Sequence, residues 1–146
     1  MTTILVCGSR DPIGDWTAPV RQWLHWVADE LRPRGAWLGG QGVTLIHGGC
    51  RGIDHLADSE ARAIGYRVVR YDADWDKFGN AAGPIRSRRM FEEGKPSLGL
   101  AFGPLVKSKI NGGVKLTGTG DMVSVMNAGG CPVILIPTPN VLPETW

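Results

Sequence analysis

The fold is decided by one stretch, Val43-Thr44-Leu45-Ile46-His47-Gly48-Gly49-Cys50-Arg51-Gly52-Ile53-Asp54. Its first residues are mostly apolar and predict a buried strand, and its glycines then turn the chain into a helix. A strand that ends in glycine and leads into a helix directs backbone N–H groups to a place where an anion can reach them. The stretch therefore predicts a strand, a turn and a helix of an α/β protein, with an anion site at the turn.

Two further glycine turns follow predicted strands. Gly8-Ser9-Arg10 comes directly after Thr3–Cys7, and Gly118-Thr119-Gly120-Asp121 comes after Leu98–Phe102 and a long loop. Arginines such as Arg10 suit a phosphate group, whereas the hydroxyl and carboxyl groups of the third turn suit a ribose or the edge of a base. The three turns together predict a pocket for a nucleotide or a nucleotide-derived small molecule.

Apolar runs and their spacing predict alternating strands and helices along the whole chain. The predicted strands are Thr3–Cys7, Val43–His47, Tyr66–Tyr71, Leu98–Phe102 and Val133–Ile136. The predicted helices end at Leu31, Ile64, Glu93 and Ala128; they begin at Asp15 or Thr17, at an N-cap Asp54, at Pro84 and at Gly120. The alternation is typical of an α/β fold in three layers, with a mainly parallel sheet of five strands, or slightly more, between helices. Ligands of such sheets bind beyond the carboxyl ends of the strands.

Composition places the chain among ordinary globular proteins. It has 146 residues, 42% hydrophobic and 21% charged, which fits one domain over 1–146 with residues 138–146 as a surface tail. The net charge of +2 does not argue for nucleic acid or a membrane as the partner. The chain begins with a strand and has no apolar run of about 20 residues, so we expect no signal peptide, no membrane span and a cytoplasmic location.

The cysteines and aspartates do not predict a metal site. Cys7, Cys50 and Cys131 are far apart and form no Cys-x-x-Cys pair, so neither zinc nor a disulfide framework is indicated. Cys7 and Cys131 are expected in the core. The alternating Asp72, Asp74 and Asp76 lie in a predicted loop over residues 72–83, and their spacing fits no named calcium loop. We expect no metal and no cofactor.

Five motifs in order give the chain a family resemblance. They are Gly8-Ser9-Arg10, residues 47–54, Ala73-Asp74-Trp75, residues 82–90 (Ala-Gly-Pro-Ile-Arg-Ser-Arg-Arg-Met) and residues 118–122 (Gly-Thr-Gly-Asp-Met). The chain resembles the YspA (YpsA-related) branch of the SLOG superfamily, from Ile4 to about Pro137. The resemblance implies a Rossmann-like sheet with a pocket for nucleotides or their derivatives.

Relatives in this superfamily differ in activity. Lonely Guy enzymes hydrolyse the N-glycosidic bond of nucleoside monophosphates, Smf proteins bind single-stranded DNA, and other members sense signalling nucleotides, including derivatives of ADP-ribose. Pockets in the superfamily are often completed by a neighbouring subunit, so the resemblance implies a homo-oligomer, a dimer or larger.

This sequence departs from the Lonely Guy pattern at Met122, where those enzymes carry a glutamate. A thioether cannot transfer a proton at neutral pH, and Asp121, one position earlier, points about 100° away on a helix. Ser87 replaces the asparagine that is usual in the branch. His47 and Asp121 are the weak catalytic candidates that remain, and the sequence does not favour an enzyme.

The predicted ligand contacts lie in the glycine turns, the acidic loop and the helix from Pro84. They are Gly8, Ser9, Arg10, Gly48, Gly49, Arg51, Gly52, Asp54, Trp75, Gly83, Arg86, Gly118, Thr119, Gly120 and Asp121. The arginines are expected around phosphate, Asp54 or Asp121 at ribose hydroxyls, and Trp75 against a base. Each of these motifs also has a purely structural interpretation. The glycines allow close packing, Asp54 and Thr119 cap helices, and the helix from Pro84 is a solvated basic helix.

The leading hypothesis is a protein that binds a phosphate-bearing, nucleotide-derived molecule, such as one resembling ADP-ribose, as a sensor, sequestering protein or carrier. The first alternative is a nucleotide hydrolase of the N-glycosidic type. The second is a single-stranded nucleic-acid module, for which the predicted loop 103–117 supplies Lys107, Lys109 and Lys115 beside the arginine helix. The tryptophans near the first helix, Trp16, Trp23, Trp26 and Trp37, fit either core packing or a subunit interface.

Overall fold

A five-stranded parallel sheet forms the centre of the protein in the computed structural model, which describes residues 2–31, 42–110 and 113–143. The strand order is β3-β2-β1-β4-β7, and every neighbouring pair is parallel. The strands are β1 (Thr2–Gly8), β2 (Val43–His47), β3 (Arg67–Arg70), β4 (Leu98–Phe102) and β7 (Val133–Ile136). The predicted number and direction of the strands are confirmed.

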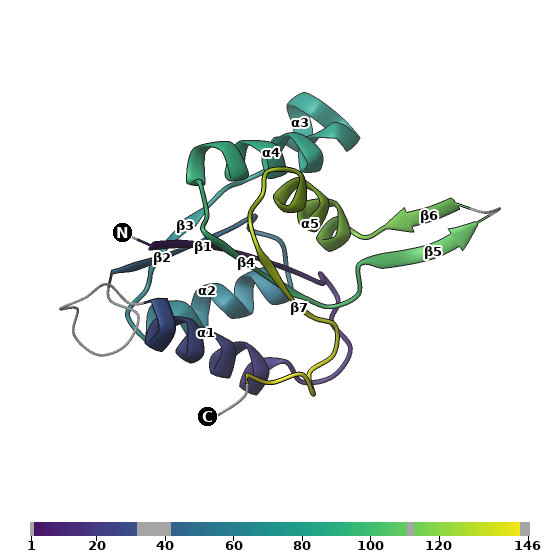
Figure 1. Ribbon diagram of the computed structural model, residues 1–146. Coiled ribbons are helices and arrows are strands. Elements are labelled where there is room, and N and C mark those ends of the chain that lie inside the picture. The colour runs from purple at the N-terminus through teal and green to yellow at the C-terminus, as the bar shows by residue number, and fades with distance from the viewer. Residues whose placement is uncertain (1, 32–41, 111–112, 144–146) are drawn as a thin grey trace.

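Helices cover both faces of the sheet, as Figure 1 shows. One face is covered by α1 (Thr17–Leu31) and α2 (Ile53–Ala63), and the other by α4 (Ala82–Gly94) and α5 (Gly118–Ala128). Alternate residues of β1 point into the two cores, because side chains of a strand alternate between faces. Ile4 and Val6 pack with the first pair of helices, and Leu5 and Cys7 with the second. The predicted three-layer α/β architecture is therefore confirmed.

The order of the strands reverses beside β1. From β1 the chain adds β2 and then β3 on one side, and α4 then carries it back across the sheet to β4 on the other side of β1. Because the strands are parallel, the carboxyl ends of all five lie at one edge of the sheet. The gap between β1 and β4 at that edge is the topological switch point, where ligands of such folds bind.

Two predicted loops contain regular structure. The segment 103–117 holds an antiparallel hairpin of β5 (Val106–Ile110) and β6 (Gly113–Leu116), which extends away from the body of the protein in Figure 1. The segment 72–83 holds the short helix α3 (Trp75–Phe78), capped by Asp74, whose carboxylate accepts from the Lys77 N–H at 3.0 Å, and a 3₁₀ turn, η1 (Gly79–Ala81). The lysines and acidic residues of these segments had favoured solvated loops.

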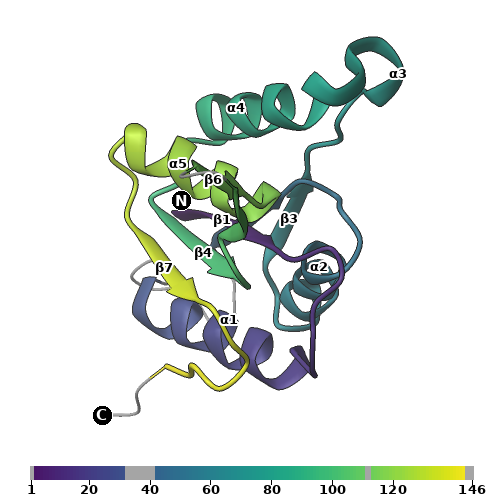
Figure 2. The ribbon, with the colours of Figure 1, turned by 90° about the vertical axis from the view of Figure 1, so that its right-hand side faces the viewer.

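The described tryptophans near α1 serve the core. Trp16 and Trp23 are buried, and Trp16 meets Phe102 edge-to-face. The Trp23 indole N–H donates to the carbonyl of Val141 at 2.8 Å, which holds the predicted tail against α1. Figure 2 shows the yellow segment after β7 running beside α1. Trp37 lies outside the described residues. Cys7 and Cys131 are buried, as predicted, and none of the described helices has the length and apolar character to cross a membrane.

Candidate functional site

A pocket of about 450 Å³ lies at the carboxyl edge of the sheet and is walled by segments far apart in the sequence. Arg10 follows β1, and residues 48–51 follow β2. Arg70 ends β3, Asp72 and Ala73 follow it, and Trp75 and Arg86 come from α3 and α4. The lining residues are Arg10, Gly48, Gly49, Cys50, Arg51, Arg70, Asp72, Ala73, Trp75 and Arg86. Two of the three glycine turns predicted to form a pocket therefore contribute to one, and the wall contains four arginines but only one carboxylate.

Arg86 is the most enclosed of these arginines. It is half-buried, its Nη1 donates to the carbonyl of Gly48, and its Nη2 lies 3.8 Å from the sulfur of Cys50. Its Nε is buried without a hydrogen-bond partner among the described residues. The guanidinium lies so close to Gly48 that a Cβ at this position would collide with it. A side chain at position 48 would therefore push the Arg86 guanidinium aside.

Arg51 and Arg70 are paired with aspartates at the pocket. Arg51 donates to both carboxylate oxygens of Asp11, at 3.0 and 2.8 Å, and this contact lowers the pKa of Asp11. Arg70 donates from Nε to Asp72 at 2.5 Å. All four side chains are at least half exposed, so each pair is weak in water and an anionic ligand can replace the aspartate at little cost.

Arg10 and Trp75 form a cation–π pair in the wall of the pocket. The Arg10 guanidinium carbon is 5.7 Å from the centre of the Trp75 ring. Trp75 remains 48% exposed, so it also offers a flat surface to a ligand. Gly83 lies beside this ring and does not itself line the pocket.

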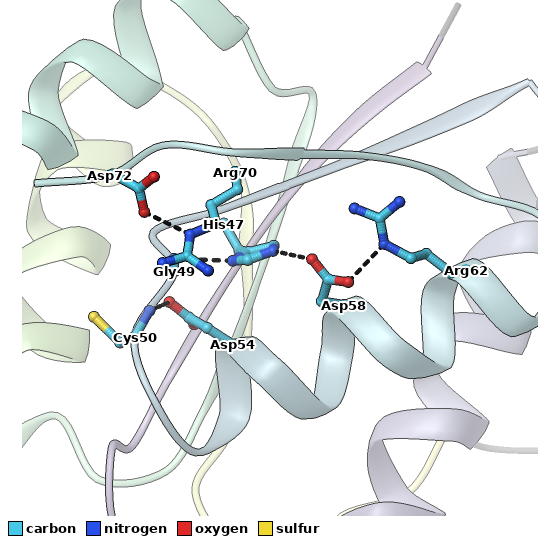
Figure 3. Close-up of polar contacts among 8 residues, drawn as sticks. All are labelled: His47, Gly49, Cys50, Asp54, Asp58, Arg62, Arg70 and Asp72. Atoms are coloured by element: carbon cyan, nitrogen blue, oxygen red, sulfur yellow. Dashed lines mark hydrogen bonds and ion pairs between the residues drawn. The ribbon is translucent and has the colours of Figure 1, made fainter.

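The loop of residues Gly48 to Arg51, called the anion loop below, is fastened from beneath by His47 (Figure 3). The Gly49 N–H donates to Nδ1 of His47 at 2.9 Å, and Nε2 lies 2.6 Å from Oδ2 of Asp58. The other oxygen of Asp58 accepts from Nε of Arg62 at 2.7 Å. His47 is only 1% exposed and both its ring nitrogens are engaged, so neither nitrogen faces the pocket as a general acid or base would.

Asp54 fastens the same loop, and its predicted role as a helix cap is wrong. The N-cap of α2 is Gly52, and Asp54 lies within the first turn, 5% exposed. Its Oδ2 accepts from the Cys50 N–H at 3.2 Å, whereas its Oδ1 has no hydrogen-bond partner among the described residues. Burial raises the pKa of Asp54, and the Cys50 N–H, His47 and Arg86 oppose that shift. Asp54 lies at the start of α2 beside Cys50 (Figure 3) and does not line the pocket.

The backbone N–H groups expected to face an anion are largely engaged within the protein. Those of Gly49 and Cys50 donate to His47 and Asp54, and the Ser9 N–H donates to the carbonyl of Phe102 at 3.1 Å. The Gly120 N–H donates to the hydroxyl of Thr117 at 2.9 Å. The arginine side chains, and not these amides, therefore give the edge of the sheet its capacity to hold an anion.

The first two glycine turns pack directly against each other through Gly8, Ser9 and Gly52. A Cβ on Gly8 would collide with Ile53, and a Cβ on Gly52 would collide with the carbonyl oxygens of Ser9 and Arg10. Gly52 also has φ +83°, a conformation that favours glycine. The Ser9 carbonyl accepts from the Ile53 N–H at 3.0 Å. These contacts hold Arg10 and the anion loop against each other.

The third glycine turn opens α5 and does not line the pocket. Thr117, not Thr119, is the N-cap, and Thr119 and Gly120 are buried. Asp121 is exposed in the first turn of α5, and Met122 packs into the core at 2% exposure. The structure thus separates Gly118, Thr119, Gly120 and Asp121 from the arginines.

Arg70, Asp72 and Cys50 line the pocket although the sequence did not single them out as ligand contacts. The signal was available for Arg70, which is the last residue of a strand whose carboxyl end shares the edge with the others. Asp72 had been considered only as a metal ligand. In the described parts of the chain, no three His, Cys, Asp or Glu side chains are grouped as metal ligands.

A second cavity of about 630 Å³ adjoins the first. It shares Arg70, Asp72, Ala73 and Trp75 with the first cavity and is completed by Asp74, Asp76 and Arg89. The two cavities together leave room for a ligand longer than a single phosphate group.

Comparison with known proteins gives one family match and one curated relative. Residues 2–78 match the model of the family described as YspA, cpYpsA-related SLOG family. The Gene 61 protein of Mycobacterium phage D29 is 33% identical over 139 residues, which cover 92% of this chain and 95% of the relative.

A solved structure shows the same fold. The X-ray structure of TM1055, a Northeast Structural Genomics Consortium target, aligns with a TM-score of 0.61 at 16% identity. The alignment covers 91% of this chain and 72% of TM1055.

Proposed function

The chain belongs to the YspA, cpYpsA-related SLOG family, and on that premise we propose that it binds a phosphate-bearing, nucleotide-derived small molecule in the arginine-lined pocket. Family membership supports a nucleotide-related function. The observation that carries the proposal is the meeting of Arg10, Arg51, Arg70 and Arg86, from four separate segments, around one pocket. Guanidinium groups form strong, charge-assisted hydrogen bonds to phosphate oxygens.

The contacts of the arginines suggest how the ligand is held. Arg86 lines the pocket and is held in place by its hydrogen bond to the Gly48 carbonyl, so it offers a preformed positive charge to phosphate. When the ligand binds, Arg51 releases Asp11 and Arg70 releases Asp72, and both arginines bind ligand oxygens instead. Trp75 stacks on a base or covers a ribose. ADP-ribose, which has a pyrophosphate between two ribose groups, is the model ligand for this arrangement.

We favour binding without turnover, in a sensor, sequestering protein or carrier. Met122 occupies the core, and both nitrogens of His47 are engaged behind the loop. The single carboxylate that lines the first cavity, Asp72, is paired with Arg70, and Asp74 in the second cavity caps α3. These observations support a pocket that holds a ligand and lacks a positioned proton donor or acceptor.

The proposal is tested by calorimetric titration of ADP-ribose into wild type, Arg86→Ala and Arg88→Ala. Arg88 is an exposed arginine on the same helix and does not line the pocket, so it is the matched control. We expect Arg86→Ala to weaken binding at least about tenfold and Arg88→Ala to leave it unchanged. Thermal unfolding of both variants controls for loss of the fold.

Two outcomes contradict the proposal. One is equal affinity in wild type and Arg86→Ala. The other is no binding of AMP, ADP or ADP-ribose by the wild type. Chromatography of the same mixtures tests the hydrolase alternative, because release of adenine or phosphate would show turnover. Native mass spectrometry of the protein purified from cells tests the proposed homo-oligomer and reports any ligand carried through purification.

A further inference from the structure

We infer that His47 is a positioning residue for the pocket and that its protonation releases the anion loop, so that ligand binding is lost in acid. The inference rests on the proposed function and adds a pH dependence to it. His47 is the last residue of β2 and lies beneath the loop, outside the pocket wall. It therefore acts on the ligand only through the backbone that it holds.

The hydrogen bonds of His47 define its protonation state. Its Nδ1 accepts the Gly49 N–H at 2.9 Å, so this nitrogen must carry a lone pair. Its Nε2 lies 2.6 Å from Asp58, so this nitrogen carries the hydrogen and donates it. Burial alone would raise the pKa of Asp58, but hydrogen bonds from Arg62 and His47 lower it below the usual value. With Asp58 ionised, a neutral His47 satisfies both contacts.

Protonation of His47 places two hydrogen-bond donors opposite each other at the contact with the Gly49 N–H. The added hydrogen on Nδ1 faces the Gly49 N–H, and a hydrogen bond between them becomes impossible. The Gly49 amide is part-buried, and the loss of its acceptor is unfavourable. The ring itself stays in place because the ionised Asp58, 2.6 Å from Nε2, stabilises the imidazolium. The loop, and not the histidine, is therefore the part that moves.

Charged groups around His47 act in both directions. From α2, Asp54 and Asp58 favour the imidazolium, and Arg62 reaches it through Asp58. Arg70, the neighbour of His47 in the β2–β3 register, and Arg86 from α4, which packs on the adjoining Gly48, disfavour it. The neutral form is thus favoured by the loop and by two arginines, and the charged form by Asp58 and, when it is ionised, by Asp54.

A shift of the anion loop changes the positions or contacts of three of the four pocket arginines. Arg51 belongs to the loop, and the Gly48 carbonyl accepts from Arg86. Gly49 lies directly against the Arg70–Asp72 pair, since a Cβ on Gly49 would collide with both side chains. Loss of the Gly49 contact therefore disperses the groups proposed to hold phosphate.

Two variants separate the contacts of His47. In His47→Asn the amide oxygen is placed near the position of Nδ1, so the variant keeps an acceptor for Gly49 that does not titrate. In His47→Gln the amide is placed near Nε2, so the contact with Asp58 is kept and the acceptor for Gly49 is lost. The probe is ADP-ribose, because it lacks the phosphate monoester whose second pKa near 6 would add its own pH dependence.

The expected results follow from these contacts. Wild-type affinity for ADP-ribose falls at least about tenfold between about pH 8 and about pH 5. His47→Asn binds with an affinity that varies little over that range, and His47→Gln binds weakly throughout. The inference is overturned if wild type and His47→Asn have the same pH profile. It is also overturned if wild-type affinity rises in acid, as attraction by a new positive charge alone would produce.

Nuclear magnetic resonance of the ligand-free wild type tests the loop itself. We expect the Gly49 amide to shift and to lose protection from hydrogen exchange as the solution is made acidic. An unresponsive Gly49 amide overturns the inference even if ADP-ribose binds. A responsive amide in a protein that binds no nucleotide supports the control of the loop by His47 and contradicts the proposed function, so the two failures are distinguishable.

Discussion

Gly48 and Gly118 are both glycines of predicted ligand turns, but their surroundings differ. A Cβ on Gly48 would collide with the Arg86 guanidinium, whereas a Cβ on Gly118 would meet no atom within 4 Å. Gly48→Ala should therefore displace Arg86 and weaken ADP-ribose binding at least about tenfold, whereas Gly118→Ala should bind as wild type does. Calorimetry of the two variants checks this. A loss in Gly118→Ala alone would place the ligand at α5 instead, and equal losses in both would contradict the predicted difference.

Asp54 leads to a prediction about pH and stability. Because burial raises its pKa in the folded state, the folded protein holds this proton more tightly than the unfolded chain does. The free energy of unfolding therefore decreases as pH rises from the unfolded-state value of about 4 through the raised folded-state pKa. The side chain in Asp54→Asn does not titrate, so the free energy of unfolding of this variant lacks this pH dependence. Its melting temperature relative to wild type should increase from about pH 4 to about pH 8. A difference that stays constant or falls would contradict this reading.

The sequence located several residues of the pocket but not their supports. Arg10, Arg51 and Arg86 follow glycines at strand or helix ends, which is a local pattern that can be read directly. The roles of His47 and Asp54 depend on contacts with Gly49 and Cys50 that form only when α2 packs beneath the loop. Such contacts leave no spacing signature, and both residues were accordingly assigned other roles.

Among the elements, α5 depends on its cap and not on a ligand. The Thr117 hydroxyl accepts from the Gly120 N–H and donates to the carbonyl of Pro104 at 2.8 Å. Thr117→Ala should destabilise the protein by about 1 kcal/mol, the usual cost of losing an N-cap side chain, and Thr117→Ser should restore most of it. Chemical denaturation measures both. Unchanged stability in the alanine variant would show that the cap contributes nothing.

The central strands of the main sheet could be predicted because they are buried on both faces. Leu98–Phe102 and Val43–His47 form as predicted, since continuous apolar runs between glycines have few other solutions in an α/β protein. The hairpin of β5 and β6 could not be predicted, because its exposed valines alternate with lysines and lie on no core. Its pairing is set by antiparallel backbone contacts and not by burial.

At the scale of the whole molecule, the order of the strands creates the site. The anion loop, Arg10 and Arg70 meet only because β1, β2 and β3 are adjacent and parallel, so their carboxyl ends share one edge. Arg86 joins them because α4 crosses the sheet on the way to β4. The third turn shares this edge but opens a helix beyond the switch point, which is why it remains outside the arginine pocket.

A crystal structure of the protein grown with ADP-ribose tests this account most directly. The account predicts pyrophosphate density within hydrogen-bond distance of Arg86 and of at least one other pocket arginine, with the Arg51–Asp11 or Arg70–Asp72 pair opened. Pyrophosphate bound at Gly118 to Asp121, with both pairs intact and the arginine pocket vacant, would contradict it.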